Sequence, residues 1–92
     1  MKYKLILSPE AKEDLLEHAQ AGNKILLNKI SLLFRELEEH PKSGTGKPKR
    51  FKYKNIIIWS RRIDLKHRLL YQIDEQFIKV IIIAAKEHYD DK

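Results

Sequence analysis

The stretch LLNKISLLFREL, residues 26–37, decides the fold because its apolar side chains recur at the period of an α-helix. They repeat at the spacing i, i+4, i+7 and i+11, which places them on one stripe that a helix buries against the rest of a domain. The helix ends before Pro41, since the residue ahead of a proline disfavours helical geometry. The stripe consists of Leu26, Leu27, Ile30, Leu33, Phe34 and Leu37.

An earlier helix and a short strand precede this stretch. Ser8 is a good N-cap and Pro9 suits the first helical position, so a helix is predicted from there to about Gln20. Gly22 follows its end, as is typical just past a helix C-terminus. Ahead of the helix, residues 3–7 are predicted to form a short strand that Ser8 and Pro9 terminate.

After the second helix the period of the pattern changes from 3.6 to 2. Gly44 and Gly46 mark residues 42–48 as a loop, and alternating segments follow it. Turns of two or three residues make neighbouring strands antiparallel. The predicted order is β-α-α-β-β-β-β, a single α+β domain over residues 1–92 with a two-helix hairpin on one face of an antiparallel sheet. The later strands are predicted at residues 49–54, 57–63, 67–73 and 77–84.

The composition indicates a polyanionic partner. Lysine and arginine number 19 against 13 acidic residues, a net charge of +6, so nucleic acid is the first candidate and an acidic protein the alternative. The chain has no cysteine, which excludes disulfide and thiolate chemistry and fits a reducing compartment. The longest apolar run, residues 80–85, is far short of the ~20 residues of a membrane span. The N-terminus lacks a signal-peptide core, and we expect a cytoplasmic protein with no membrane partner.

Arginines of the predicted sheet are the first candidates for chemistry. Alternation in residues 67–73 sends Leu69 and Tyr71 to the core face and Arg68 to the uncovered face, where its planar fork can hold two phosphate oxygens. The alternative is a cross-strand ion pair. Arg61 and Arg62 must face opposite sides, so that one can join Arg68 while the other meets water or a helix end. Trp59 can stack a base, but core packing is the favoured interpretation.

Further basic residues lie in GKPKRFKYK, residues 46–54. Alternation divides their charges between the two faces of the sheet, so that not all of them can contact one RNA strand. The candidate RNA- or phosphate-binding residues are Lys47, Arg50, Lys52, Lys54, Arg61 and Arg62.

His88 and Tyr89 follow the last predicted strand and can transfer a proton or stack on a base, the alternative being a frayed tail. His18 and His40 are assigned to helices as partly exposed, non-catalytic residues. No cluster has metal-ligand spacing and no glycine-rich loop precedes a helix, so neither a metal nor a cofactor is expected.

Four segments together resemble the YoeB/Txe branch of the RelE/ParE toxin superfamily, along nearly the whole chain. They are KLILSPEAKEDL (4–15), HPKSGTGKP (40–48), WSRRIDLKHRLLY (59–71) and the HY pair at 88–89. The third is the most specific, because a tryptophan, paired arginines and His-Arg-x-x-Tyr rarely coincide by chance.

The resemblance implies a type II toxin that is held inactive by a YefM/Axe-like antitoxin. It implies a metal-independent endoribonuclease that cleaves mRNA in the ribosomal A site by attack of a 2′-hydroxyl, with a homodimer left open. By similarity, Arg68 stabilises charge, His88 transfers a proton and Tyr89 orients the substrate or supports the acid.

Lys49 departs from the resemblance, because the family usually has a glutamate there that is read as the general base. Three interpretations are open. Lys49 can be a further phosphate clamp with His88 as base, or itself the base, since the surrounding positive charge favours its neutral form. The substitution can also have crippled the enzyme. Ile56-Ile57 in place of a Ser-Gly turn, and the extra residues 90–92, are further departures.

Two other functions remain as alternatives. A non-catalytic, ParE-like inhibitor of DNA gyrase needs neither the terminal His-Tyr pair nor the tryptophan–arginine hairpin. A degenerate toxin that only binds antitoxin would explain Lys49.

Overall fold

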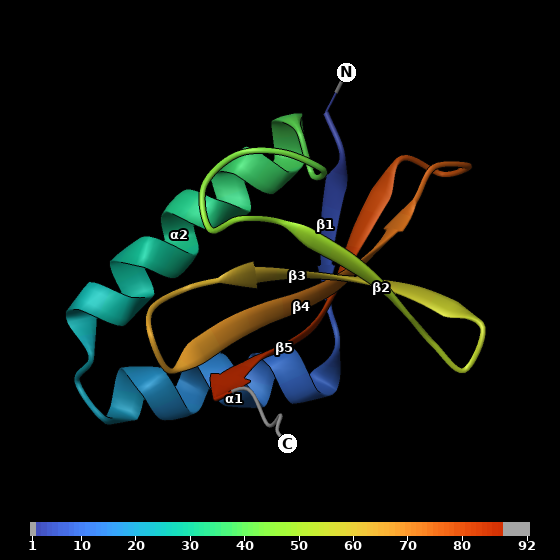
Figure 1. Cartoon of the computed structure of the whole chain (residues 1–92). Helices are drawn as coiled ribbons and strands as arrows, with labels where there is room; N and C mark the ends of the chain where they lie inside the picture. The colour runs from blue at the N-terminus through green and yellow to red at the C-terminus, as the bar shows by residue number, and fades with distance from the viewer. Residues whose placement is uncertain (1, 88–92) are drawn as a thin grey trace.

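The computed structural model describes residues 2–87 and confirms the predicted order of elements. Two helices follow the first strand and pack against a sheet whose other four strands come later in the chain (Figure 1). The helix bounds agree with the sequence prediction, including the N-cap, where the Ser8 side chain accepts a hydrogen bond from the backbone N–H of Ala11. The elements are β1 Lys4–Leu7, α1 Pro9–Gln20, α2 Lys24–Glu39, β2 Lys49–Tyr53, β3 Ile56–Arg62, β4 His67–Asp74 and β5 Lys79–Glu87.

The sheet has the strand order β1-β5-β4-β3-β2. The pairs β2–β3, β3–β4 and β4–β5 are antiparallel, as their short connections predicted, whereas β1 pairs with β5 in parallel. Both helices and three strands separate β1 from β5 in the chain, so no tight turn imposes an antiparallel pair there. The sheet is therefore mixed.

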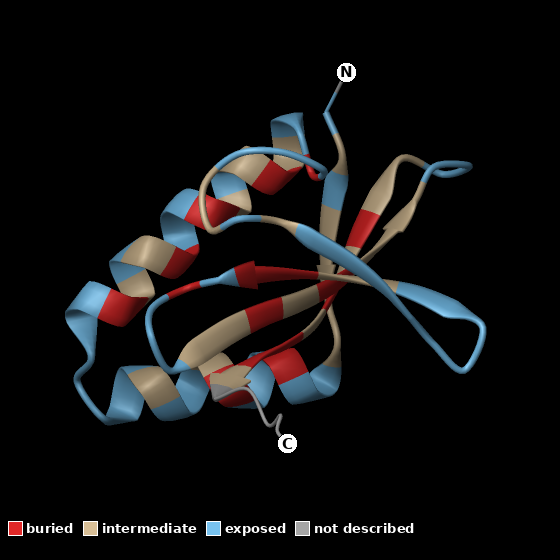
Figure 2. Cartoon of the chain, viewed as in Figure 1, coloured by how far each residue is buried: buried red, intermediate tan, exposed pale blue. Residues whose placement is uncertain are grey.

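The core lies between the helices and one face of the sheet. The predicted stripe of α2 is buried against β4 and β5, and Figure 2 shows its buried positions on the side of the helix that faces the sheet. Trp59 packs at the edge of this core with its ring stacked on Tyr71, the ring centroids lying 6.5 Å apart. The interpretation of Trp59 as a core residue is confirmed. The buried cluster is Ala11, Leu26, Ile30, Leu33, Leu37, Ile63, Leu69, Tyr71, Val80, Ile82 and Ala85.

The β2–β3 hairpin extends beyond the part of the sheet that the helices cover (Figure 1), and β2 is exposed along its whole length (Figure 2). Its two-residue turn is formed by Lys54 and Asn55, whose φ angles are 50° and 67°. Positive φ at both positions is the requirement of a type I′ turn, which suits the twist of a hairpin. The strands therefore end at Tyr53 and resume at Ile56, one residue earlier on each side than predicted.

β5 begins at Lys79 rather than at residue 77. The preceding turn is closed by Asp74, whose side chain accepts hydrogen bonds from the backbone N–H groups of Gln76 and Phe77. Such an Asx turn competes with strand pairing for these backbone groups. Within residues 2–87, no helix is long and apolar enough to cross a membrane.

Candidate active site

The uncovered face of the sheet gathers basic side chains from four strands. Residues opposite each other in antiparallel strands share a face, and the register pairs Arg62 with Arg68 and Arg68 with Lys86. One step further along, Lys49 of β2 pairs with Ser60 of β3. Because Arg61 and Leu69 are buried on the helix side, alternation places this whole set on the opposite face.

Arg68 lies where alternation predicted it. Its side chain is half-buried, and its Nη1 donates a hydrogen bond to the Oγ of Ser60 over 3.3 Å. No ion pair joins Arg68 to any side chain that the structure describes, so the alternative of a cross-strand ion pair finds no partner within the described residues. Its remaining N–H donors can therefore bind the oxygens of an anion.

Arg61, in contrast, is a structural residue, and its prediction as a phosphate contact is wrong. The side chain is 0% exposed, and it donates from Nε to the Tyr71 hydroxyl over 3.1 Å. Nη1 donates to Glu36 over 2.7 Å and to the Thr45 carbonyl over 3.3 Å. Nη2 donates to the carbonyls of His40 and Ser43 over 2.8 and 2.6 Å. An arginine has five N–H donors, and these contacts occupy them all.

The Arg61 network fixes the loop that leads into β2. Burial alone would raise the pKa of Glu36, but hydrogen bonds from Thr45 and Arg61 outweigh it and hold the pKa below its ordinary value. Gly46 closes the same loop, because its carbonyl accepts from the Arg62 backbone N–H over 2.8 Å. A Cβ at Gly46 would lie 2.7 Å from the Arg62 carbonyl oxygen, which only glycine avoids.

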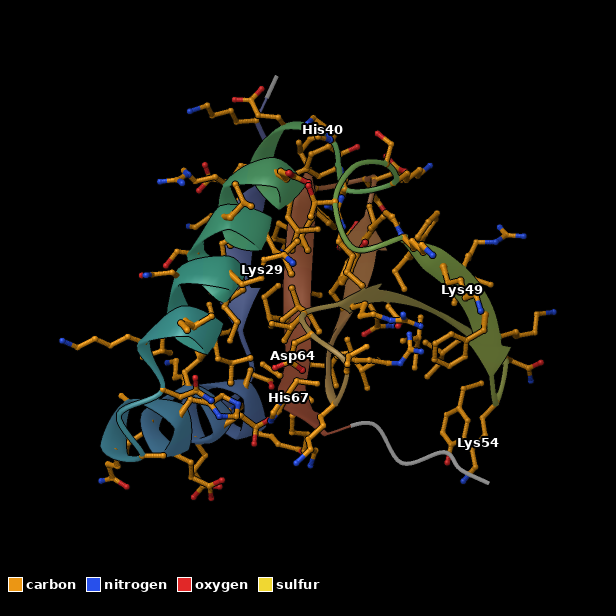
Figure 3. The ribbon with its side chains drawn as sticks, turned by 60° about the vertical axis from the view of Figure 1, so that its left-hand side comes forward. Lys29, His40, Lys49, Lys54, Asp64 and His67 are labelled. Carbon is orange, nitrogen blue, oxygen red and sulfur yellow. The ribbon has the colours of Figure 1, made fainter. Side chains whose placement is uncertain are left out.

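The other predicted RNA-binding residues do not all reach the site. Arg50 and Lys52 lie opposite Trp59 and Ile57, on the helix-side face of the hairpin. Lys47 stands in the loop before β2, and Lys54 in the hairpin turn. Lys49 is thus the member of this group that the register places on one face with Arg62 and Arg68. Figure 3 shows Lys49 and Lys54 at opposite ends of β2, well apart from Asp64 and His67.

α1 holds the end of β5, an arrangement that the sequence analysis missed. β1 ends at Leu7, so the outer edge of β5 beyond Ile82 has no neighbouring strand. Asp14, itself buried, accepts from the Ala85 backbone N–H over 3.0 Å, and the Nε2 of His18 lies 2.7 Å from the Ala85 carbonyl oxygen. A carbonyl only accepts, so this Nε2 carries the proton. Side chains of α1 thereby satisfy an otherwise unpaired strand edge.

The spacing of Asp14 and His18 was the available signal, since residues four apart share one face of a helix. Next to them, the ring of His67 meets that of His18 edge-on at 5.2 Å, and its Nδ1 lies 2.9 Å from Asp64. The chain leaves the sheet beside Arg68, whose register partner is Lys86. The predicted catalytic residues His88 and Tyr89 lie outside the described residues.

Comparison with known proteins identifies the family. The model of the YoeB-like toxin of bacterial type II toxin-antitoxin systems matches residues 7–89. The chain belongs to this family. Toxin YoeB of Escherichia coli K12 is 36% identical over 86 residues, which cover 94% of this chain and 99% of that protein.

Two solved structures from Staphylococcus aureus are similar to this YoeB-like toxin over nearly its whole length. The YoeB dimer has a TM-score of 0.82 at 31% identity, and the YoeB–YefM complex has 0.79 at 32%. Each match covers 97% of this chain and 100% of the other. The fold of this YoeB-like toxin, its mixed sheet included, is thus that of its family.

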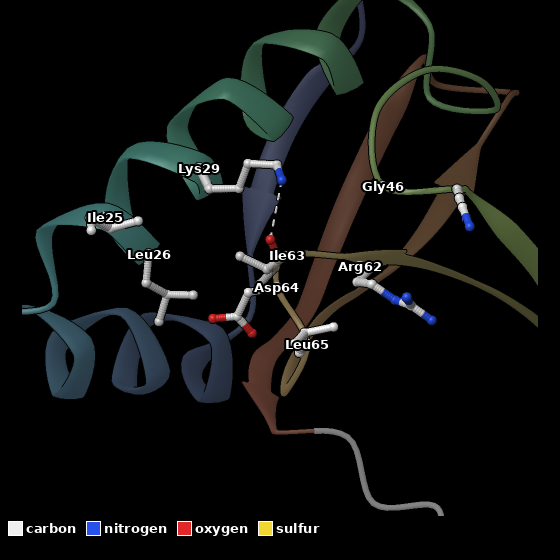
Figure 4. Close-up of a pocket in the computed structure, with 9 residues that line it drawn as sticks. Ile25, Leu26, Lys29, Gly46, Arg62, Ile63, Asp64 and Leu65 are labelled. Atoms are coloured by element: carbon white, nitrogen blue, oxygen red, sulfur yellow. Dashed lines mark hydrogen bonds between the residues drawn. The ribbon is translucent and has the colours of Figure 1, made fainter.

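A cavity of about 500 Å³ opens between α2 and the β3–β4 turn of this YoeB-like toxin (Figure 4). Lys29 of α2 donates to the Ile63 carbonyl over 3.2 Å across its wall. Arg68 does not line it, so the cavity is separate from the basic face and meets it only at Lys47 and Arg62. Within residues 2–87, no group of acidic and histidine side chains could hold a metal ion. The lining residues are Ile25, Leu26, Lys29, Gly46, Lys47, Arg62, Ile63, Asp64 and Leu65.

Proposed function

We propose that this YoeB-like toxin is a metal-independent, ribosome-dependent endoribonuclease that cleaves mRNA in the ribosomal A site and so inhibits translation. The observation that carries the proposal is the pair Arg62 and Arg68, opposite each other on the uncovered face. Two guanidinium forks at this spacing match the oxygens of a phosphodiester, and guanidinium keeps its charge at any physiological pH.

The proposed reaction proceeds within the RNA itself. A base takes the proton of a ribose 2′-hydroxyl, and the 2′-oxygen attacks the adjacent phosphorus. The bond from phosphorus to the 5′-oxygen of the next nucleotide breaks, and an acid protonates that oxygen. The products are a 2′,3′-cyclic phosphate and a 5′-hydroxyl, and no step requires a metal ion.

This chain's residues supply the charge and the proton transfers. Arg68, with Arg62 beside it, stabilises the negative charge that develops on the phosphorane-like transition state, which is worth about 3 kcal/mol for one well-placed donor. By resemblance, His88 transfers a proton, a contribution of ~10² to 10⁴ in rate, and Tyr89 orients the substrate or supports the acid.

Lys49 acts as a third cation at the phosphate, with His88 as the base. Its place on one face with Arg62 and Arg68 supports this role over that of a displaced charge at the periphery. The alternative in which Lys49 is itself the base makes a different prediction for its substitution by glutamate, as described in the Discussion.

The proposed partners are a YefM-like antitoxin and the ribosome with its mRNA, and the proposed assembly of the free toxin is a homodimer. The similar toxin from Staphylococcus aureus has been solved both as a dimer and in complex with YefM. The basic surface of this chain suits the phosphates of both mRNA and ribosomal RNA.

A translation reaction with purified protein tests the function. The ends of the mRNA are mapped after incubation with and without ribosomes. Cuts that need ribosomes and leave 5′-hydroxyl ends support the proposal. Intact mRNA together with inhibited DNA gyrase would replace it by a ParE-like function, and intact mRNA with tight antitoxin binding alone would indicate a degenerate toxin.

A further inference from the structure

Two aromatic rings stand exposed on the same face as the paired arginines. Phe51 is 43% exposed and Tyr53 is 56% exposed, although both belong to a regular strand. The register places Phe51 opposite Ile58 and Tyr53 opposite Ile56. Alternation from Lys49 puts both rings on the uncovered face.

The stripe of Lys49, Phe51 and Tyr53 leads away from the arginine pair along one strand. Alternate residues of a strand lie about 7 Å apart, so a cation and two rings follow one another at regular intervals. Sheet-based RNA-binding domains present aromatic side chains on an open sheet face in this manner, and unstacked bases settle on the rings. Stacking of this kind tolerates any base, because every base has a π-face.

The charge around the rings decides which partner they suit. From Glu39 to Asp64 the chain contains no acidic residue between the two, while lysine and arginine recur throughout. In addition, the Nζ of Lys54 lies 5.5 Å from the centre of the Tyr53 ring. Aromatic rings interleaved with cations combine a stacking surface with phosphate attraction, which is the composition of single-strand binding grooves. An apolar protein surface would leave these charges without partners.

We propose that Phe51 and Tyr53 form a stacking platform for two bases of single-stranded RNA next to the phosphate held by Arg62 and Arg68. This inference rests on the proposed function, whose substrate it extends by two nucleotides. The platform holds the strand in an extended path along β2, and Lys49 lies between the platform and the arginine pair.

The test uses a short single-stranded RNA with one 2-aminopurine and with 2′-O-methyl groups, which prevent cleavage. Stacking quenches 2-aminopurine fluorescence, so a titration at ~50 mM salt reports both affinity and stacking. Phe51→Leu and Tyr53→Leu keep an apolar side chain but remove the ring, and each should weaken binding about tenfold and abolish part of the quench. Tyr53→Phe should bind as the unaltered protein does.

Phe77→Leu is the matched control. Phe77 is also an exposed aromatic, 62% exposed, with the Nζ of Lys79 5.2 Å from its ring centre, but it lies in the β4–β5 turn. Its substitution should leave affinity and quench unchanged. The dependence of affinity on salt should be the same for both leucine variants as for the original chain, because a stacked ring neutralises no phosphate.

The platform would be refuted if the unaltered protein did not quench the probe, or if the leucine variants quenched it fully. It would also be refuted if those variants bound RNA normally but lost self-association in sedimentation, which would make the hairpin a protein interface. Normal A-site cleavage by such variants would leave the proposed function intact. Quenching without any ribosome-dependent cleavage would leave the platform and remove the function.

Discussion

Arg61 and Arg62 are adjacent in the chain and opposite in role. The Arg61 side chain is 0% exposed and spends all its donors on the loop before β2 and on Tyr71, whereas Arg62 is exposed and pairs in register with Arg68. The residue type is the same, and the face of β3 decides between a structural strut and a candidate phosphate ligand. A basic residue near an active site is therefore assigned only after its face of the sheet is known.

Arg61→Ala should give the largest effect on either side of this comparison. It leaves the carboxylate of Glu36 and several carbonyls without their buried partner, which typically costs about 3–5 kcal/mol of the free energy of unfolding. Urea denaturation followed by circular dichroism measures it. Arg62→Ala is the matched control and should change stability by less than about 0.5 kcal/mol. Equal losses in the two variants would abolish the distinction between the faces.

Lys49→Ala should affect cleavage and leave folding unchanged, because the side chain is exposed. Loss of a cation at the transition state should slow single-turnover cleavage of ribosome-bound mRNA about 10²-fold. Lys49→Glu should retain measurable activity, since it restores the carboxylate that the family has as base. Full activity of Lys49→Ala would move this residue to the periphery of the site. Complete inactivity of Lys49→Glu would favour Lys49 as the base.

Asp14→Ala tests how α1 holds the end of β5. The variant leaves the Ala85 N–H without its acceptor in a buried position, at a typical cost of about 1–3 kcal/mol in the free energy of unfolding. Asp14→Asn retains an acceptor oxygen and should recover most of that loss. Hydrogen exchange at the Ala85 amide gives a local readout, and unchanged protection in Asp14→Ala would show that the contact does not hold the strand.

The pH dependence of stability should show the smallest effect. The pKa of Glu36 is held below its usual 4.5, so the ionised form is favoured in the folded state. Its contribution is fully present above about pH 4.5 and is lost as the pH falls toward the lower folded value. Glu36→Gln should remove this part of the acid dependence, as measured by urea denaturation between pH 3 and 6. An identical pH profile in the variant would contradict the assignment.

The local elements could be predicted from the sequence because their signals are local. The apolar stripe of residues 26–37, the Ser8-Pro9 helix start and the alternation around Arg68 each act within a few residues. The role of Arg61 could not be predicted, because its partners come from α2, the following loop and β4. The hold of α1 on Ala85 joins residues 71 apart for Asp14 and 67 apart for His18, which no local pattern encodes.

The pairing of β1 with β5 is a second long-range feature of this kind. The first strand showed only a short apolar pattern, and such a pattern does not specify a partner. The short turns between the later strands do specify theirs, and those pairings were predicted. Residues that act at sequence-local positions were thus placed correctly on their face, and those that depend on tertiary contacts were not.

The account's central claim is that the uncovered face of the sheet carries out RNA cleavage. Single-turnover cleavage of ribosome-bound mRNA by Arg68→Ala, beside its urea denaturation curve, tests this claim most directly. The account predicts a rate at least about 10²-fold lower, with stability close to that of the original chain. Cleavage by Arg68→Ala at the normal rate would contradict it.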